Sequence, residues 1–245
     1  MSDTSKLTHL DLSKMIDHSL LNPTLTEEAL ERGIQLALAY DAGSVCIMPF
    51  ALKRCASLLK GSSVKASTTI GFPHGGVTTD TKQAETVQAL RDGGQELDMV
   101  VNISKVLSGD WDYVEADIRV VIEIAHEAGQ KVKVIFENCY LNNEQKIRLC
   151  QICSDLGADW VKTSTGYGTS GATDEDLKLM RQHAAPNIQV KAAGGIRDLD
   201  ALLRVRAIGV TRVGATATAI IMDEFRRREG LEPIIFNSNT TPAGY

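Results

Sequence analysis

The chain has 245 residues, of which 43% are hydrophobic and 23% are charged, and its formal net charge is −5. These values are ordinary for a globular domain that can bury a sizeable core. The charges form no long run of one sign, which argues against nucleic-acid or membrane-surface binding, because both favour a basic patch. The polar start, Met1 to Leu10, lacks the apolar core of a signal peptide, and no apolar stretch could span a bilayer. We therefore expect a cytoplasmic protein.

In chain order, short β-branched runs alternate with longer segments of helical periodicity. The candidate strands are Met15–Leu20, Ser44–Met48, Val64–Ile70, Glu96–Ile103, Lys131–Glu137, Asp159–Ser164, Ile188–Ala193 and Thr211–Gly214. Eight strand-then-helix units without a linker-like break predict one α/β domain over residues 1–245, a (β/α)8 or TIM barrel. A doubly wound open sheet is the alternative, but no Gly-x-Gly-x-x-Gly motif follows the first strand. Residues 229–245 are expected to form a polar, irregular tail.

Strand parity predicts which side chains point into the barrel. Side chains alternate between the two faces of a strand, and the face that meets the helices must be apolar. With Val161 and Val190 on the helix side, Lys162 and Lys191 point inward. The same parity turns inward Asp17, Cys46, Glu96, Asp98, Asn102, Lys133, Glu137 and Ser164. Burying charges is costly unless they are paired. A core selected for stability alone would not hold this set, so the parity predicts a catalytic site.

The residue types in this set suggest the chemistry of an amine nucleophile. Lysine is a poor nucleophile while it is protonated, and both desolvation and a second cation lower its pKa. Lys162 and Lys191 lie at matching depth on consecutive strands, so one amine could attack a carbonyl while the other holds its pKa down. Asp98 could move protons. Lys133 and Glu137 are expected to form a supporting pair that positions Asp98 or Lys162. A structural Lys–Asp–Lys salt-bridge network is the alternative.

Small residues follow the last three expected strands, as Thr165-Gly166, Ala193-Gly194-Gly195 and Gly214-Ala215-Thr216. In barrels, the loops after strands seven and eight often bind phosphate through backbone N–H groups, which glycine lets approach closely. The sequence therefore predicts a phosphate site at this rim. Arg197 either attracts phosphate or opens the next helix.

Other reactive residues receive structural interpretations. The five cysteines are an odd number in a mid-sized chain and predict reduced thiols. Cys150 and Cys153 have metal-like spacing but lie within a helical segment without a second pair, so helix packing is expected and no metal or other cofactor is predicted. His18 is expected to pack in the core and His74 to belong to a turn. Tyr245, the last residue, is a candidate proton donor to the site.

These residues resemble those of the deoxyribose-phosphate aldolase family from about Met15 to Ile221. The motifs that carry the resemblance are Ile16-Asp17-His18-Ser19-Leu20-Leu21, Ser44-Val45-Cys46-Ile47-Met48-Pro49, Gly71-Phe72-Pro73-His74-Gly75, Glu96-Leu97-Asp98-Met99-Val100-Val101-Asn102, Lys133-Val134-Ile135-Phe136-Glu137, Val161-Lys162-Thr163-Ser164-Thr165-Gly166 and Val190-Lys191-Ala192-Ala193-Gly194-Gly195-Ile196-Arg197. The two lysine motifs, in this order and spacing, are highly specific.

The resemblance implies a class I aldolase that reversibly cleaves 2-deoxy-D-ribose 5-phosphate into D-glyceraldehyde 3-phosphate and acetaldehyde. It implies that Lys162 forms the Schiff base, that Lys191 lowers its pKa, and that Asp98 relays protons with a water. The substrate-binding residues that it implies are Asp17, Cys46, Thr165, Gly166, Gly194, Gly195, Gly214 and Thr216. It also implies a homodimer.

The sequence departs from the family pattern in two places. Asn22 stands where many relatives carry Lys, and Ala215-Thr216-Ala217 replaces a Ser-rich stretch, so one hydroxyl contact to the phosphate is expected to be missing. Two other functions stay open: a related lysine-dependent aldolase for another sugar phosphate, and a non-catalytic barrel that binds sugar phosphates.

Overall fold

The computed structural model describes residues 7–236, in which eight parallel strands form a closed barrel in chain order, with β1 paired to β8. The strands are β1 Ile16–Leu20, β2 Ser44–Ile47, β3 Lys65–Ile70, β4 Glu96–Val100, β5 Lys131–Ile135, β6 Trp160–Lys162, β7 Gln189–Ala193 and β8 Arg212–Ala215. Every expected strand is present, so the predicted (β/α)8 fold is confirmed.

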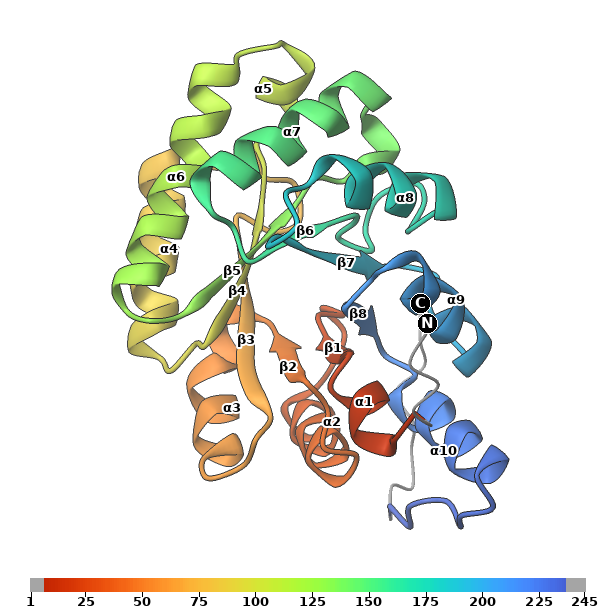
Figure 1. Cartoon of the computed structure of the whole chain (residues 1–245). Helices are drawn as coiled ribbons and strands as arrows, with labels where there is room; N and C mark the ends of the chain where they lie inside the picture. Colours follow the sequence, from red (N-terminus) through yellow and green to blue (C-terminus); the bar gives the residue numbers. More distant parts are fainter. Residues whose placement is uncertain (1–6, 237–245) are drawn as a thin grey trace.

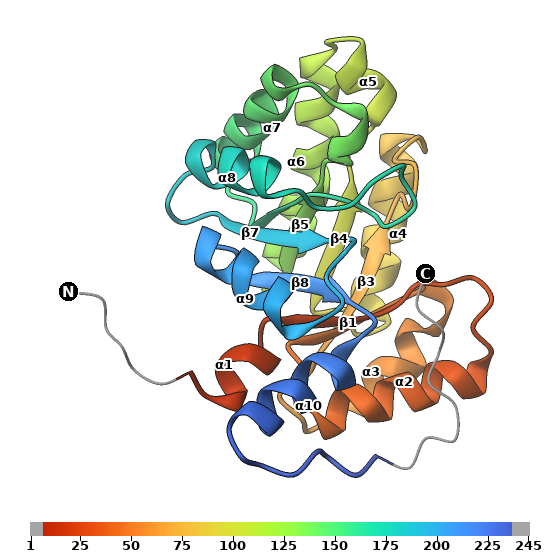
Figure 2. The same ribbon diagram turned by 90° about the vertical axis from the view of Figure 1, so that its right-hand side faces the viewer.

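Helices surround this barrel, as Figure 1 shows. They are α1 His9–Ser13, α2 Glu27–Ala39, α3 Leu52–Leu59, α4 Thr79–Arg91, α5 Ile103–Leu107, α6 Trp111–Glu127, α7 Asn143–Leu156, α8 Asp174–His183, α9 Leu199–Ile208 and α10 Thr218–Arg228, with 3₁₀ turns η1 Pro49–Ala51 and η2 Asn138–Tyr140. Side-chain caps fix where several helices begin, as at Thr26, Asn142 and Thr173. Figure 2 shows α1 near the end of the barrel where β7 and β8 begin. None of the helices in residues 7–236 is long and apolar enough to cross a membrane.

The core between strands and helices follows the predicted parity. Val161, Val190 and Leu97 on the helix side of their strands are fully buried. His18 also faces the helices, as expected, and its Nδ1 lies 2.8 Å from the Thr218 hydroxyl at the start of α10. Burial lowers the pKa of His18 to about 4. This ring is therefore a neutral core group and not part of the barrel interior.

Four expected strands, those of β2, β4, β5 and β6, are too long at their carboxyl ends, and the error matters most for β4 and β5. β4 stops at Val100, and Asn102 instead caps α5 by accepting a hydrogen bond from the Lys105 N–H at 3.2 Å. The expectation that Asn102 points into the barrel was therefore wrong. β5 stops at Ile135, and Glu137 has a φ of 58°, which is outside the extended region. Alternating parity applies only while the backbone stays extended, so it fails beyond these ends.

The described part of the expected tail, residues 229–236, contains a turn at 229–230 and no helix or strand. Tyr245 lies outside the described residues.

Candidate active site

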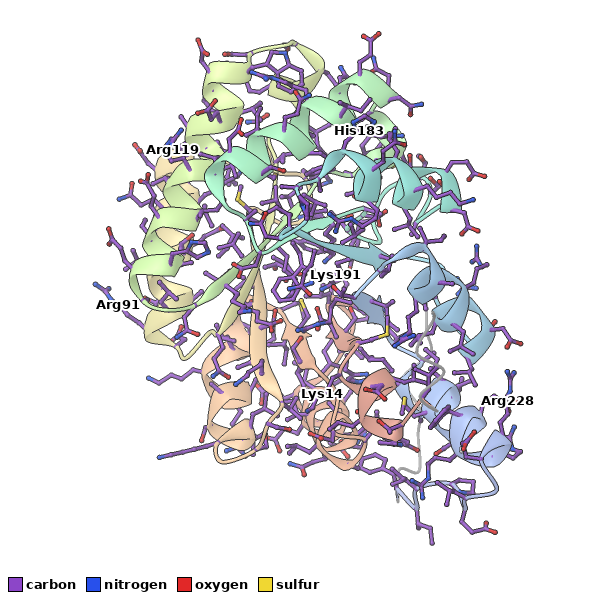
Figure 3. The ribbon with its side chains drawn as sticks, in the orientation of Figure 1. Lys14, Arg91, Arg119, His183, Lys191 and Arg228 are labelled. Atoms are coloured by element: carbon purple, nitrogen blue, oxygen red, sulfur yellow. The ribbon has the colours of Figure 1, made fainter. Side chains whose placement is uncertain are left out.

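The two predicted lysines are direct neighbours, Lys162 as the last residue of β6 and Lys191 as the middle residue of β7. Lys162 on β6 and Lys191 on β7 are register partners in the parallel ladder. Both side chains point into the barrel and are almost fully buried, with relative exposures of 3% and 1%. Figure 3 shows Lys191 inside the barrel, whereas Arg91, Arg119 and Arg228 project from the outer helices. The matching depth predicted from the sequence is confirmed.

Asp98, from β4, links the two lysines. Its Oδ2 lies 2.8 Å from Nζ of Lys162 and 2.7 Å from Nζ of Lys191. Its Oδ1 accepts from Nζ of Lys133, on the adjacent β5, at 2.9 Å. One fully buried carboxylate thus contacts the amine nitrogens of three lysines.

A second layer of charges lies below this cluster. Asp17 on β1 contacts Lys191 and accepts from the Ser44 hydroxyl at 2.6 Å. Arg212, the first residue of β8, donates to Asp17 Oδ1 at 2.5 Å and to both oxygens of Glu96 at 2.9 and 3.1 Å. Nζ of Lys133 lies 2.6 Å from Glu96. Strand parity predicted that Glu96 points inward. Arg212 was not predicted, although the same parity along β8 places Arg212 on the inner face with Gly214.

The charges of this interior do not balance. Among the described residues, four cationic side chains share three carboxylates, so the fully ionised cluster carries an excess positive charge. The four cations are Lys133, Lys162, Lys191 and Arg212. An unpaired charge in a low-dielectric interior is costly, and loss of one proton removes the excess. The neutral group should be the cation with the weakest hold on a carboxylate.

By its contacts, Lys162 is the cation with the weakest hold. Burial lowers its pKa, Asp98 opposes the shift, and the charge of Lys191 adds to it, with a net lowering. Burial also acts against the charge of Lys191, but Asp17 and Asp98 outweigh it and raise the pKa of Lys191. The difference follows from the contacts, because Lys162 has only the shared Asp98 as an ion-pair partner within residues 7–236.

The carboxylates stay ionised in this setting. Burial would raise the pKa of Asp98, but Lys133, Lys162 and Lys191 outweigh it and hold that pKa far below its usual value. The pKa of Asp17 is likewise lowered, against its burial, by Arg212 and the lysines. Asp98 is therefore a hydrogen-bond acceptor placed between one lysine whose pKa is lowered and one lysine whose pKa is raised.

A cavity of about 340 Å³ opens above the lysines at the carboxyl ends of the strands, where barrel enzymes have their active sites. The predicted residues that line it are Asp17, Cys46, Lys162, Thr165, Gly166, Lys191, Gly194, Gly195, Gly214 and Thr216. Ala193 and Ala215 of the expected phosphate loops and Arg197 also line it, and the lining residues that the prediction left out are Ser19, Leu21, Gly168, Ser170, Gly171 and Ile196. Burial raises the pKa of the Cys46 thiol, so this side chain is neutral.

Glu137 has a different partner from the one predicted. It accepts hydrogen bonds from the backbone N–H and the hydroxyl of Thr165, whereas Lys133 pairs with Asp98 and Glu96. The predicted Lys133–Glu137 pair was therefore wrong, because β5 ends before Glu137. Lys133 supports Asp98 from below, and Glu137 fixes the loop that follows Lys162.

The loop between β6 and α8 forms one wall of the cavity. Its Ala172 N–H donates to the carbonyls of Ala193 and Gly194 at 3.0 and 3.2 Å. A Cβ atom on Gly171 would lie 2.5 Å from the Gly194 carbonyl oxygen, so the close approach requires glycine. The Tyr167 hydroxyl donates to the Leu21 carbonyl at 2.8 Å and joins this loop to the end of β1.

The rim of the cavity has backbone N–H groups suited to an anion. The N-cap of α10 is Ala217, which makes no side-chain cap hydrogen bond, and the preceding Thr216 lines the cavity. The first N–H groups of a helix lack intrahelical partners and attract anions. Arg197 lines the cavity, and Asp198, not Arg197, caps α9. This position favours the expectation that Arg197 attracts phosphate over the expectation that it opens the next helix.

The remaining reactive residues lie away from the cluster. Cys150 and Cys153 are buried in α7 as free thiols, as expected for packing. His74 is exposed in a turn after β3. Within residues 7–236, no group of three His, Cys, Asp or Glu side chains is arranged to hold a metal ion.

The fold and the position of the cavity define a (β/α)8-barrel enzyme class, and the comparisons narrow it further. Residues 12–223 match the model of the DeoC/LacD family of aldolases. A deoxyribose-phosphate aldolase of Rhodopirellula baltica is 63% identical over 235 residues, which cover 96% of this chain and 97% of that protein. The chain belongs to the DeoC/LacD aldolase family.

Solved structures agree with this assignment. The structure of an aldolase called QR15 has a TM-score of 0.85 and 36% identity, over 90% of this chain and 98% of that one. A tetrameric deoxyribose phosphate aldolase from Aeropyrum pernix has a TM-score of 0.83 and 29% identity, over 89% of this chain and 92% of that one.

Proposed function

We propose that this chain is a class I aldolase that reversibly cleaves 2-deoxy-D-ribose 5-phosphate into D-glyceraldehyde 3-phosphate and acetaldehyde through a Schiff base on Lys162. The observation that carries the proposal is the Lys162–Asp98–Lys191 cluster at the floor of the cavity. The activity named for the 63% identical relative supports the choice of substrate.

Imine formation begins at the lysine whose pKa is lowered. The neutral Lys162 amine attacks the C1 carbonyl of the open-chain sugar, and the carbinolamine then loses water to give the iminium ion. Asp98 contacts Nζ of both lysines through one oxygen, so with a water it can take the proton from the attacking nitrogen and return it to the departing hydroxyl. Lys191 stays charged and disfavours a proton on Lys162.

Carbon–carbon cleavage uses the iminium ion as an electron sink. The electron pair of the C2–C3 bond moves toward the iminium nitrogen, and the C3 hydroxyl loses its proton as C3 becomes the aldehyde of glyceraldehyde 3-phosphate. The enamine that remains is protonated at C2. Water then hydrolyses the new iminium ion, which releases acetaldehyde and restores the Lys162 amine.

The phosphate end of the substrate would lie at the small-residue rim of the cavity. Gly166, Gly194, Gly195 and Gly214 allow close approach of backbone N–H groups. Thr216 and Ser170 add hydroxyls, Arg197 adds charge, and the start of α10 adds N–H groups, while Thr165 lines the cavity with its hydroxyl donated to Glu137. Ser170 offers a hydroxyl that the Ala215-Thr216-Ala217 stretch lacks.

We further infer that the sugar phosphate and acetaldehyde are the small-molecule partners, that two copies form a homodimer, and that the protein acts in the cytoplasm without a metal or other cofactor. Light scattering behind size-exclusion chromatography tests the dimer. A monomer or a larger assembly would contradict that part alone.

Trapping with borohydride tests the reaction. Incubation with acetaldehyde and borohydride should add one ethyl group to Lys162 and inactivate the enzyme, whereas Lys162→Ala should gain no such group at the site. The wild type should cleave 2-deoxyribose 5-phosphate, and Lys191→Leu should cleave it much more slowly. An adduct that maps to another residue would contradict the proposal.

The same assay separates the other two functions. Trapping at Lys162 with negligible turnover of 2-deoxyribose 5-phosphate would indicate an aldolase for another sugar phosphate. Binding of the sugar phosphate without trapping or turnover would indicate a non-catalytic barrel.

A further inference from the structure

The ion network does not end at the lysines but continues to the floor of the barrel. Glu96 and Arg212 are the first residues of β4 and β8, on opposite sides of the barrel, and they form a two-pronged ion pair. Neither lines the upper cavity. Both line a second cavity of about 370 Å³ at the amino ends of the strands, with Lys131 and Trp160.

Each floor residue is connected to one of the reactive lysines through a carboxylate. Glu96 forms an ion pair with Lys133, and Lys133 forms one with Asp98. Asp98 is the only ion-pair partner of Lys162 within the described residues. Arg212 holds Asp17, which in turn holds Lys191. Lys162 and Lys191 therefore compete for Asp98. Other ion pairs of this network are made with Glu96 and Arg212 at the floor of the barrel.

On the basis of the proposed function, we propose that Glu96 and Arg212 are positioning residues that decide which of the two lysines carries the proton. Neither touches the substrate cavity. Arg212 pairs with Asp17, and Glu96 pairs with Lys133, which pairs with Asp98. These contacts set how strongly Asp17 and Asp98 can attract a proton to Lys191 or Lys162. The Glu96–Arg212 pair adds no net charge, so it keeps the excess of the whole network at one positive charge.

Removal of one floor charge should move Lys162 in a defined direction. Glu96→Gln raises the positive excess and leaves Lys133 with Asp98 and Asp17 as its carboxylates, so Lys162 loses its proton more easily. Arg212→Met removes the excess and leaves Asp17 to Lys191 and Lys133, so Asp98 holds a proton on Lys162 more firmly. A unit charge roughly 10 Å away, at an effective dielectric constant near ~20, shifts a pKa by about one unit.

The pH profile of kcat/KM for 2-deoxyribose 5-phosphate cleavage tests this. The acid limb is the fall in kcat/KM at low pH, where Lys162 becomes protonated. Its midpoint should move to lower pH by about one unit in Glu96→Gln and to higher pH by about one unit in Arg212→Met. The double variant should return close to the wild-type limb. A purely structural pair would lower stability in both variants without opposite shifts.

Lys131→Met is the matched control. Lys131 lines the same lower cavity but is exposed and lies outside the ion network, 3.8 Å from Asp159. Water screens its charge, so the acid limb should stay at the wild-type pH. A shift in Lys131→Met as large as that in Arg212→Met would overturn the proposal, because any charge at the floor would then suffice.

Chemical rescue keeps the test decisive if Arg212→Met folds poorly. The Arg212 side chain is 11% exposed and opens onto the lower cavity, so Arg212→Ala leaves space that a guanidinium ion can enter. Added guanidinium should return the acid limb of Arg212→Ala toward the wild-type value, and Arg212→Lys should lie near the wild type. Unshifted limbs, or limbs that move in the same direction, would overturn the proposal. Failure of wild-type trapping at Lys162 would instead contradict the proposed function.

Discussion

The molecule buries lysine in two places with different surroundings. Lys82 on α4 is fully buried, and its Nζ lies 2.5 Å from Asp117 of α6 and 2.7 Å from the Val100 carbonyl. Asp117 also accepts from the Thr79 hydroxyl at 2.9 Å. One cation thus meets one carboxylate. In the barrel interior, Lys162 shares its single carboxylate with two other lysines.

The comparison shows that a lowered pKa does not by itself identify a nucleophile. Burial lowers the pKa of Lys82, against Asp117, just as burial lowers the pKa of Lys162, against Asp98. Two other features separate the sites. Lys162 lines a cavity that a substrate can enter, and it belongs to a cluster with excess positive charge. Lys82 does not line that cavity, and its charge is matched.

The largest expected difference is in catalysis. Lys162→Met should lower kcat/KM for sugar-phosphate cleavage by about 10³-fold or more, because it removes the amine that forms the imine. Lys82→Met should leave kcat/KM of the folded fraction within about threefold of wild type, since its amine touches no substrate. Steady-state kinetics, corrected for the folded fraction by circular dichroism, measure both. Comparable losses in the two variants would contradict the distinction.

For stability, we expect the larger loss at Lys82 and not at Lys162. Lys82→Met leaves Asp117 buried without its partner and should cost about 3–5 kcal/mol of unfolding free energy. Lys162→Met removes a cation that the cluster cannot fully neutralise, so stability should stay unchanged or rise. Urea denaturation measures both. The pair Lys82→Met with Asp117→Leu should recover most of the loss, because no unpaired charge remains.

A smaller effect concerns how stability changes with pH. The pKa of Lys162 is lower in the folded chain than its ordinary value of 10.5, so the unfolded chain binds more protons between those two pH values. Wild-type stability therefore gains from this group as pH rises through that interval, whereas Lys162→Met lacks the gain. The stability advantage of Lys162→Met should shrink from pH 7 to pH 10 in matched urea titrations. A constant difference would indicate that Lys162 keeps its proton.

The sequence contained enough information for the barrel and the reactive cluster. β-branched runs located the strands, and alternation along them turned Lys162, Lys191 and Asp98 inward, where the structure brings them together. The prediction failed where backbone alternation stops. Glu137 and Asn102 lie just beyond strand ends, and their side chains follow loop and capping geometry instead.

Other parts of the site depend on contacts that have no local pattern. The cavity wall formed by Ser170 and Gly171 comes from a loop that packs against Gly194. Neither the hydrophobic periodicity nor the composition of the sequence indicates that this loop approaches Gly194. The lowered pKa of Lys162 also depends on how carboxylates from β1 and β4 are divided among four cations. Parity can place Arg212 inside the barrel, but only the three-dimensional arrangement shows which carboxylates it holds.

The central claim is that Lys162 is the neutral amine of an interior with more cations than carboxylates. NMR of the protein labelled with ¹³C and ¹⁵N in lysine follows each side-chain amine through a pH titration, and Lys162→Met and Lys82→Met assign the two buried signals. We predict that the Lys162 signal titrates below the exposed lysines, and that it moves to still lower pH in Glu96→Gln. A Lys162 signal that titrates with the exposed lysines, near their ordinary pKa of about 10.4, would contradict the account.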